Sequence, residues 1–406
     1  MKTYRVGILG FGMIGRVHAY GYATLPFYYD PPPLSARITH VVTTRAETAE
    51  KARRLVGADV AATDFRAVTE NPDIDIVHIC SPNDRHCEAL LSAIAHQKHI
   101  YCDKPLVATW DQARQVAAAL ENYRGTAQMT FQCRFFPATL RAKQLIDEGR
   151  LGRVLQFRAA YLHGGNADPN APARWKLSGA AGGGVIADLA SHVFDLVEHL
   201  AGPIDAVMAE TYTAYAERPS TEDPSRKVVI DAEDCVLILA RLQSGAPGTI
   251  EATKIASGAE DELRIEIHGS QGALRFNLMD SHHLEFYDAT AADCPLGGVR
   301  GWNRIDTGQR YLPPAAAFPS HKAAIGWTRG HVACLANFLQ AVAQGRVAEP
   351  GIEQGIRVQQ LIEYVRQSAR EQRWVQASMS SSCTSTSHTG SLGSGSGRSP
   401  SANRRA

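Results

Sequence analysis

A glycine motif close to the start of the chain restricts its fold more than any other feature. Gly10-Phe11-Gly12-Met13-Ile14-Gly15 directly follows a strand-like run, residues 4–9, and directly precedes residues 14–22, which can open a helix. Glycines at this spacing let backbone N–H groups and a helix N-terminus approach a pyrophosphate. The motif therefore predicts a dinucleotide site formed by residues 10–15. A glycine turn that serves only packing is the alternative.

The segments that follow the motif support this interpretation. Strand-like and helix-like stretches alternate up to about residue 130, which is typical of a parallel sheet covered by helices. Residues 26–33 contain four prolines and three aromatic residues, and they predict either a loop over the cofactor or substrate mouth or an ordinary surface loop. We thus expect a doubly wound α/β domain over residues 1–130, with further strands at 38–42, 74–80, 99–102 and 127–131 and helices at 46–56, 84–96 and 110–120.

The second half of the chain has a different pattern. Long β-like runs joined by short glycine-containing turns predict a large, open, mostly antiparallel sheet packed on helices, an α+β domain over residues 131–376. Irregular loops are expected at 219–226 and 289–314. Residues 377–406 are rich in Ser and Gly and predict a disordered tail. The expected strands are 153–162, 206–215, 234–242, 247–255, 263–268 and 272–276, with helices at 186–200, 330–343 and 353–371.

Composition limits the partners of the chain. Lys and Arg number 42 and Asp and Glu 41, a net charge of +1, which gives no electrostatic reason to expect nucleic acid or an anionic membrane. No apolar run reaches the ~18 residues of a membrane span. Eight scattered cysteines without a CxxC pair and a start without a signal-peptide pattern predict a cytoplasmic globular protein. The absence of GxxxxGK[ST] excludes a P-loop nucleotidase.

The end of the second predicted strand bears on which dinucleotide binds. The strand is followed by Thr43-Thr44-Arg45, with no carboxylate before Glu47. A carboxylate at this place would hold the ribose 2′-hydroxyl of NAD, whereas an Arg accommodates the 2′-phosphate of NADP. A hydroxyl at Thr44 beside the Arg45 guanidinium therefore favours NADP over NAD. A solvated residue at the start of a helix is the alternative for Arg45.

Two polar segments follow the third and fourth predicted strands. They are Ser81-Pro82-Asn83-Asp84-Arg85-His86 and Tyr101-Cys102-Asp103-Lys104-Pro105. Ligands of doubly wound sheets bind at the carboxyl edges of the strands, so both segments are predicted to face the ligand. Lys104 is then either a hydrogen-bond donor aimed into the cleft or a surface cation. The residues expected near the dinucleotide are Ser81, Pro82, Asn83, His86, Asp103 and Lys104.

A third segment, Gly182-Gly183-Gly184-Val185-Ile186-Ala187-Asp188-Leu189-Ala190-Ser191-His192, carries an acid–base pair. Asp188 and His192 are four residues apart and would share one face of a helix. A histidine held by a carboxylate is a natural general base. An exposed pair without function is one alternative. A metal site is another, because Asp195 and His199 repeat the spacing, but no HExxH motif or Cys cluster supports a metal and none is predicted.

Taken together, these motifs resemble the glucose–fructose oxidoreductase/inositol dehydrogenase (Gfo/Idh/MocA) family. The family's Glu-Lys-Pro signature appears as Asp103-Lys104-Pro105, and its Thr-Pro-Asn-x-x-His element looks like residues 81–86. Its Gly-Gly-x-x-x-Asp-x-x-x-His element matches residues 183–192. The resemblance covers residues 3–375 and implies an N-terminal Rossmann domain and a C-terminal α/β domain with an open sheet. Residues 161–177 look like those of members that act on sugars.

The resemblance also implies roles for individual residues. Lys104 would hydrogen-bond the reacting oxygen, His192 would take or return its proton, and Asp188 would orient both His192 and the substrate. Arg134, His163 and Trp175 are weaker candidates for substrate contact. The predicted function is NAD(P)-dependent hydride transfer between a nicotinamide and a secondary alcohol or ketone of a sugar or cyclitol.

Two other functions follow from the same resemblance, and one assembly follows from the predicted sheet. Some relatives keep NAD bound and cleave a glycosidic bond or isomerise a centre, and others look like dinucleotide-sensing regulators. The regulators tend to lose the lysine or the histidine, which this chain retains. An exposed sheet face in the second domain would allow a homodimer or homotetramer.

Overall fold

The sheet of the N-terminal half is a six-stranded parallel sheet. The computed structural model describes residues 2–316 and 318–377, and the first sheet has the strand order β3-β2-β1-β4-β5-β6. This is the doubly wound order, whose switch point lies between β1 and β4, so the predicted fold of the N-terminal half is confirmed. Its strands are β1 (Thr3–Leu9), β2 (Ser35–Val42), β3 (Val60–Ala62), β4 (Ile76–Ile79), β5 (His99–Cys102) and β6 (Ala127–Met129). Its helices are α1 (Met13–Tyr28), α2 (Ala46–Val56), α3 (Arg66–Thr69), α4 (His86–Ala95) and α5 (Trp110–Ala119).

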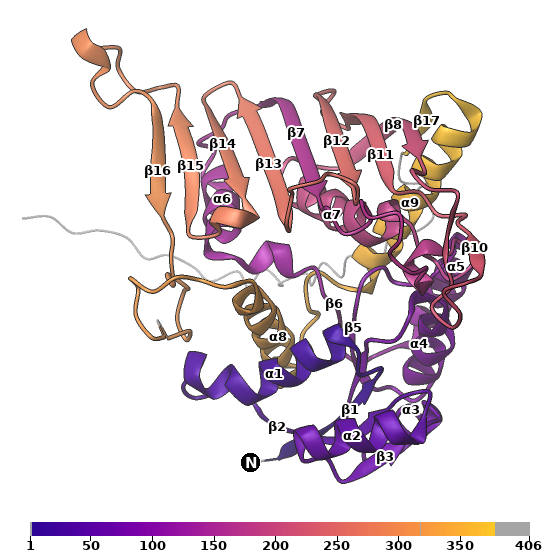
Figure 1. Ribbon diagram of the computed structural model, residues 1–406. Helices are drawn as coiled ribbons and strands as arrows, with labels where there is room; N and C mark the ends of the chain where they lie inside the picture. Colours follow the sequence, from indigo (N-terminus) through magenta and orange to yellow (C-terminus); the bar gives the residue numbers. More distant parts are fainter. Residues whose placement is uncertain (1, 317, 378–406) are drawn as a thin grey trace, which may run out of the picture.

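The second sheet has nine strands in the order β16-β15-β14-β13-β7-β12-β11-β8-β17. Only β7 and β12 pair in parallel, so the prediction of a large, mostly antiparallel sheet is confirmed. The helices α6 (Pro137–Asp147), α7 (Ser191–Leu200) and α9 (Ile352–Glu371) cover one face, and the other face is open (Figure 1). The strands are β7 (Val154–Leu162), β8 (Ile204–Tyr212), β11 (Cys235–Leu242), β12 (Pro247–Thr253), β13 (Glu262–Gly269), β14 (Gly272–Asn277), β15 (His283–Asp288), β16 (Trp302–Asp306) and β17 (Val375–Gln376).

One helix from the C-terminal part of the chain packs against the first domain. Helix α8 (Trp327–Gln344) lies against α1, and its Leu335, Phe338 and Leu339 belong to the same buried cluster as Val6 and Ile8 of β1. The cluster is apolar on both elements, which makes this contact favourable by about 25 cal/mol for each Å² removed from water. The described residues also include Ala377, which is buried. The rest of the predicted tail, 378–406, lies outside the described residues.

Two predicted loops contain regular structure. The prediction of a loop over 26–33 was wrong for its first part, because α1 continues to Tyr28 with Pro26 inside it. The apolar packing of Leu25 and Tyr29, both buried, compensates for the hydrogen bond that a proline removes. Directly after α1, Tyr29 forms an antiparallel β-bridge with Ala315, which lies far away in the sequence. The predicted loop 289–314 contains β16, an exposed edge strand.

Buried histidines lie between α1 and the first sheet. The Nδ1 atom of His18 lies 3.0 Å from Nδ1 of His78, whose Nε2 is 2.8 Å from the Tyr22 hydroxyl. Burial lowers the pKa of His18 to about 4 and holds the pKa of His78 well below its usual 6.5. Burial acts in the same direction on the pKa of His192, His199 and His331. These five imidazoles are therefore neutral in the folded protein near neutral pH.

This histidine set predicts loss of stability in mild acid. Below a pH of about 6.5 the unfolded chain binds protons that the folded chain does not, so the free energy of unfolding falls as the pH falls. Each such histidine contributes up to about 1.4 kcal/mol per pH unit. We expect the free energy of unfolding in urea to drop by several kcal/mol between about pH 7 and about pH 5. His18→Gln should make that slope shallower and exposed His96→Gln should not. A free energy that is flat over this interval would contradict the account.

Candidate active site between the two domains

Lys104 and Asp188 meet where the two domains touch. Lys104 follows β5 of the first sheet, and its Nζ donates to the Asp188 carbonyl oxygen at 2.6 Å and to Oδ1 at 3.0 Å. Both side chains are largely buried, with 11% and 15% of their surfaces exposed. A second bond across the same boundary joins Asn83 Nδ2 to the Gly182 carbonyl at 2.9 Å. The structure thus brings together two motifs that are 84 residues apart in the sequence.

The glycine run before Asp188 makes this close approach possible. Gly182 has φ of +72°, and a Cβ there would lie 2.7 Å from Ala108 of the first domain. Gly184 has φ of +99°, and its Cβ would lie 2.2 Å from the Glu233 carboxylate. An L side chain would be strained at both positions. The glycines therefore allow the protein's own segments to approach one another.

Three lysines surround the Asp188 carboxylate. Besides Lys104, Lys176 Nζ lies 2.9 Å from Oδ1 and 3.1 Å from Oδ2, and Lys254 Nζ lies 2.5 Å from Oδ2. Neither Lys176 nor Lys254 was predicted from the sequence. Lys176 lies in the short turn Trp175–Leu177, and Lys254 directly follows β12. We call these three side chains and Asp188 the lysine cluster.

The expected pairing of Asp188 with His192 is not present. Among the described residues no hydrogen bond or ion pair joins the two side chains, because both carboxylate oxygens are occupied by lysines. The local backbone explains the difference. Ile186–Ala190 form a π-helical turn, whose backbone hydrogen bonds join residues five apart rather than four apart and so change the direction of the side chains. The α-helical spacing argument therefore did not apply at Asp188.

The charges of the lysine cluster influence one another strongly. Burial would raise the pKa of Asp188, but the three ammonium groups outweigh it and hold that pKa well below 3.8. Burial would lower the pKa of Lys104, but the Asp188 and Asp103 carboxylates outweigh it, so the pKa is raised. The pKa of Lys176 is lowered by burial, and repulsion from the other two lysines adds to this effect. Lys104 is consequently a stable cation beside an ionised carboxylate.

His192 lies next to this cluster with a free ring nitrogen. The side chain is buried, and its Nδ1 has no hydrogen-bond partner among the described residues. The centroid of its ring lies 5.8 Å from that of Tyr161 and 6.3 Å from that of Phe131. Burial, reinforced by the charge of Lys104, holds the pKa of His192 well below 6.5. His192 is thus a neutral imidazole that can accept a proton at neutral pH.

The three weaker substrate candidates separate into two groups. Trp175 adjoins Lys176 in sequence, and the backbone N–H of His163 donates to the carbonyl of Thr253, the neighbour of Lys254. Both are partly exposed beside the lysine cluster. Arg134 is different, because its Nε and Nη2 donate to the two carboxylate oxygens of buried Asp195 at 2.8 and 2.5 Å. Arg134 therefore supports helix α7 rather than facing a substrate, and Asp195 is used in this ion pair.

The glycine motif has the local geometry that a dinucleotide needs. A Cβ at Gly10 would lie 2.6 Å from the Cys80 carbonyl oxygen, and one at Gly15 would lie 2.2 Å from the Gly10 carbonyl oxygen. A Cβ at Gly12 would meet no heavy atom within 4 Å. Helix α1 has no side-chain cap, so the N–H groups of its first turn are available to a phosphate. The loop therefore fits a dinucleotide, with Phe11, Met13 and Ile14 beside the glycines.

Gly12 gives a test that separates binding from folding. Because a methyl group at this position touches nothing in the protein, Gly12→Ala is expected to leave Tm within about 2 °C of wild type. The same methyl group should obstruct the pyrophosphate and raise the Kd for reduced nicotinamide cofactor about tenfold or more. Fluorescence titration and thermal unfolding measure the two quantities. Gly15→Ala serves as the contrast, since it should lower Tm as well. Unaltered cofactor affinity in Gly12→Ala would contradict this role.

The remaining residues predicted to bind the cofactor differ in their exposure to solvent. Thr44 and Arg45 are exposed just after β2, and Ser81 and Pro82 follow β4. Asp103 Oδ1 accepts a bond from the Thr130 hydroxyl at 2.6 Å. His86 is fully buried, and its ring nitrogens lie 2.8–3.2 Å from the carbonyl oxygens of Ser81, Pro105 and Leu106. His86 thus ties the two sheet-edge segments together, so its predicted contact with the cofactor is corrected to a positioning role.

Comparison with known proteins places this arrangement in a family. Residues 4–131 match the model of an oxidoreductase family's NAD-binding Rossmann fold, and residues 143–377 match that family's C-terminal alpha/beta domain. The chain belongs to the Gfo/Idh/MocA oxidoreductase family. The resemblance seen in the sequence is confirmed, and the first domain of this family member is an NAD(P)-binding Rossmann domain.

Individual relatives cover nearly the whole chain. Levoglucosan dehydrogenase of Pseudarthrobacter phenanthrenivorans is 31% identical over 92% of this chain and 98% of its own length. Inositol 2-dehydrogenase of Rhizobium meliloti is 25% identical over 92% of this chain and 99% of its own. A structure of levoglucosan dehydrogenase in complex with NADH and levoglucosan superposes with a TM-score of 0.85, covering 92% of this chain and 99% of that one. The predicted likeness to sugar dehydrogenases is thereby confirmed.

Among residues 2–316 and 318–377, none of the helices combines the length and the apolar character that crossing a bilayer requires.

Proposed function

We propose that this Gfo/Idh/MocA protein is an NAD(P)-dependent dehydrogenase that transfers a hydride between the nicotinamide and a secondary alcohol or ketone of a sugar or cyclitol. One observation carries the proposal. Lys104, at the carboxyl edge of the Rossmann sheet, is bonded to Asp188 of the segment that also carries the neutral His192. The names of the relatives, a levoglucosan dehydrogenase and an inositol 2-dehydrogenase, support the substrate class.

The side chains divide the work of such a reaction. The nicotinamide, when bound, supplies the hydride chemistry. The Lys104 ammonium donates a hydrogen bond to the reacting oxygen and stabilises the negative charge that develops on it. Asp188 keeps Lys104 charged and fixes its position. The neutral imidazole of His192 accepts the hydroxyl proton during oxidation and returns it during reduction.

We further propose that the preferred cofactor is NADP. Thr44 and Arg45 lie exposed after β2, where a 2′-phosphate would be recognised. A structure of the related levoglucosan dehydrogenase holds NADH, so this preference needs a direct test. Arg45→Ala should weaken NADPH binding about tenfold and change NADH binding by less than about twofold. Equal affinity of the wild type for NADH and NADPH would contradict the preference.

The dehydrogenase proposal is tested by a cofactor-binding titration followed by a substrate screen. The Kd values of both cofactors are measured first, and a panel of sugars and inositols is then mixed with the enzyme and the tighter cofactor. A change in nicotinamide absorbance with a matching amount of ketone is expected for at least one substrate. If the cofactor binds and no panel member changes the absorbance, the proposed dehydrogenase function fails.

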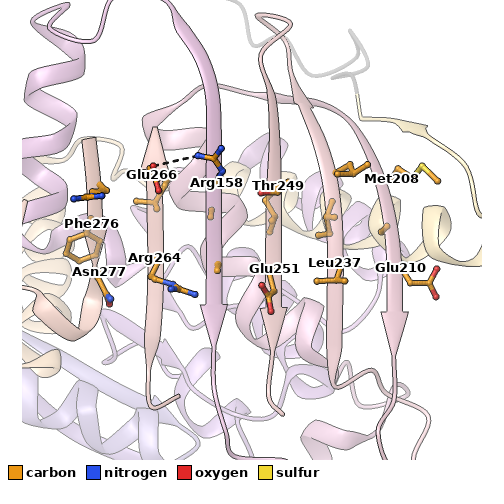
Figure 2. A pocket seen from close by; sticks show the side chains of 18 of the residues that line it. Arg158, Met208, Glu210, Leu237, Thr249, Glu251, Arg264, Glu266, Phe276 and Asn277 are labelled. Carbon is orange, nitrogen blue, oxygen red and sulfur yellow. Dashed lines mark ion pairs between the residues drawn. The ribbon is translucent and has the colours of Figure 1, made fainter. Parts of the chain in front are cut away.

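The open face of the second sheet supports a proposed homo-oligomer. A hollow of about 750 Å³ spans this face, and its lining includes Leu239. Leu237 and Met208 lie on one side of it, and Arg158 and Glu266 lie toward the other (Figure 2). Leu237 and Leu239 have 54% and 51% of their surfaces exposed. Contiguous apolar side chains of this kind mark interaction sites. We propose that the protein is a dimer or tetramer, and a monomeric mass from light scattering would exclude this.

A further inference from the structure

We propose that the substrate carries a negatively charged group, a carboxylate or a phosphate ester, which binds to Lys254 and Lys176 of the lysine cluster. This inference rests on the proposed dehydrogenase function, which it narrows to an acidic class of sugar or cyclitol. Three observations carry the inference. The cluster has more positive than negative charge, its ammonium groups have N–H bonds without a protein acceptor among the described residues, and one side of it is exposed to solvent.

The lysine cluster lacks counter-charge. Asp188 is the one carboxylate within 4.0 Å of the three ammonium groups among the described residues. Asp103 acts on Lys104 from farther away, and Asp261 accepts from the Tyr161 hydroxyl at 2.5 Å. Among the described residues, Lys176 and Lys254 therefore share Asp188 with Lys104 as their one carboxylate in contact. Holding the buried Lys254 ammonium on a shared anion is unfavourable.

The ammonium groups also have donors to spare. Each carries three N–H bonds. Lys254 is buried, yet its Nζ contacts a single protein acceptor among the described residues, Asp188 Oδ2. The contacts of Lys176 Nζ are both to the same carboxylate. An anionic oxygen group would take up these donors and supply the missing charge, whereas a neutral hydroxyl would take up only the donors.

The accessible side of the cluster suits a sugar ring. Lys176 has 42% of its side chain exposed, and its neighbours Trp175 and His163 have 38% and 41% exposed. An exposed tryptophan offers an apolar surface against which the C–H face of a sugar can pack. Burial lowers the pKa of Lys176, and the positive charges of Lys104 and Lys254 add to this effect. Such a site is electrostatically prepared for an anion.

The test compares matched substrates that share a ring and differ by one anionic group. Values of kcat/KM are measured for glucose, glucuronate and glucose 6-phosphate, and for inositol and inositol monophosphate, with the preferred cofactor. We expect one charged partner to exceed its neutral counterpart by about 100-fold, equivalent to two charge-assisted hydrogen bonds. Its KM should also rise with added salt. Preference for the carboxylate or for the phosphate identifies which anion the cluster binds.

Variants then assign the preference to the cluster. Lys254→Met should lower the charged-to-neutral ratio of kcat/KM by about tenfold or more. Lys176→Met, at a partly exposed position that tolerates change more easily, should act in the same direction. The control Lys51→Met removes an exposed lysine of α2 and should leave the ratio as in wild type. Because the readout is a ratio, a general loss of activity does not imitate the effect.

The failure of this inference differs from the failure of the proposed function. If neutral sugars are oxidised as well as their charged partners, the anionic substrate is excluded and the dehydrogenase function stands. A preference for charged substrates that survives in both lysine variants would also overturn the assignment. If the cofactor binds and neither class is oxidised, the dehydrogenase function itself fails.

Discussion

Replacing Lys104 by methionine is expected to lower kcat/KM by about 10³-fold while leaving the affinity for the cofactor nearly unchanged. The substitution keeps the length of the side chain and removes the ammonium that touches Asp188 at 2.6 and 3.0 Å. One preorganised donor to a developing oxyanion contributes about 10²–10³-fold, and the lost charge adds to this. Steady-state kinetics with the best substrate of the panel measures the effect.

Two controls show whether the loss in Lys104→Met is chemical. The Kd for the cofactor should stay within about threefold of wild type, because the glycine motif and not Lys104 holds the pyrophosphate. Lys51→Met, on the exposed side of α2, should retain wild-type kinetics. Activity of Lys104→Met within about threefold of wild type would remove Lys104 from the mechanism, since one donor contributes far more than that.

The second large effect is expected from His192→Gln. Glutamine preserves a polar side chain but cannot accept a proton near neutral pH, so kcat should fall by about 10²–10⁴-fold. His199→Gln is the matched control, because it changes another histidine of α7 that lies beside Arg134 in a separate hollow. The kcat of His199→Gln should remain within about threefold of wild type, because this variant leaves the His192 imidazole in place.

The pH dependence sharpens this test. Because burial and Lys104 hold the pKa of His192 well below 6.5, the wild-type kcat/KM should not decline as the pH falls through about 6.5. In His192→Gln the remaining activity should rise with pH, since hydroxide replaces the missing base. The account would be contradicted if the wild-type kcat/KM fell below an apparent pKa near 6.5 and this fall were absent from His192→Gln. His192 would then be protonated near pH 6.5, whereas the structure predicts a neutral imidazole.

Much of the fold could be predicted because it depends on local patterns. The glycine motif and the alternation of strands and helices indicated the Rossmann sheet, and the long β runs indicated the second sheet. Short strands carried too little pattern, so β3 with three residues was missed. Glycines and prolines in residues 289–314 favoured the prediction of a loop, so the edge strand β16 was missed. The extension of α1 through Pro26 depends on packing against segments far away in the sequence, which a local pattern does not contain.

The candidate site likewise contains residues that short sequence motifs predict and residues that only the folded chain brings together. Lys104, Asp188 and His192 could be named because each belongs to a short motif. Lys176 and Lys254 could not, because isolated lysines become a cluster only when the two domains place them around Asp188. Arg134 was assigned to the substrate because its partner Asp195, 61 residues away, gave no local signal. One lysine directly after Trp175 and another inside the predicted strand 247–255 were the local signals available.

The most direct measurement uses a sugar deuterated at the carbon that loses hydrogen. The account predicts that this deuterium appears in the reduced nicotinamide in an amount equal to the ketone formed, with a slower rate than for the unlabelled sugar. Lys104→Met should slow this transfer by about 10³-fold, and His192→Gln should slow it by about 10²–10⁴-fold. If the sugar is cleaved or isomerised and the released cofactor contains no deuterium, net hydride transfer to the nicotinamide is not the reaction of this protein.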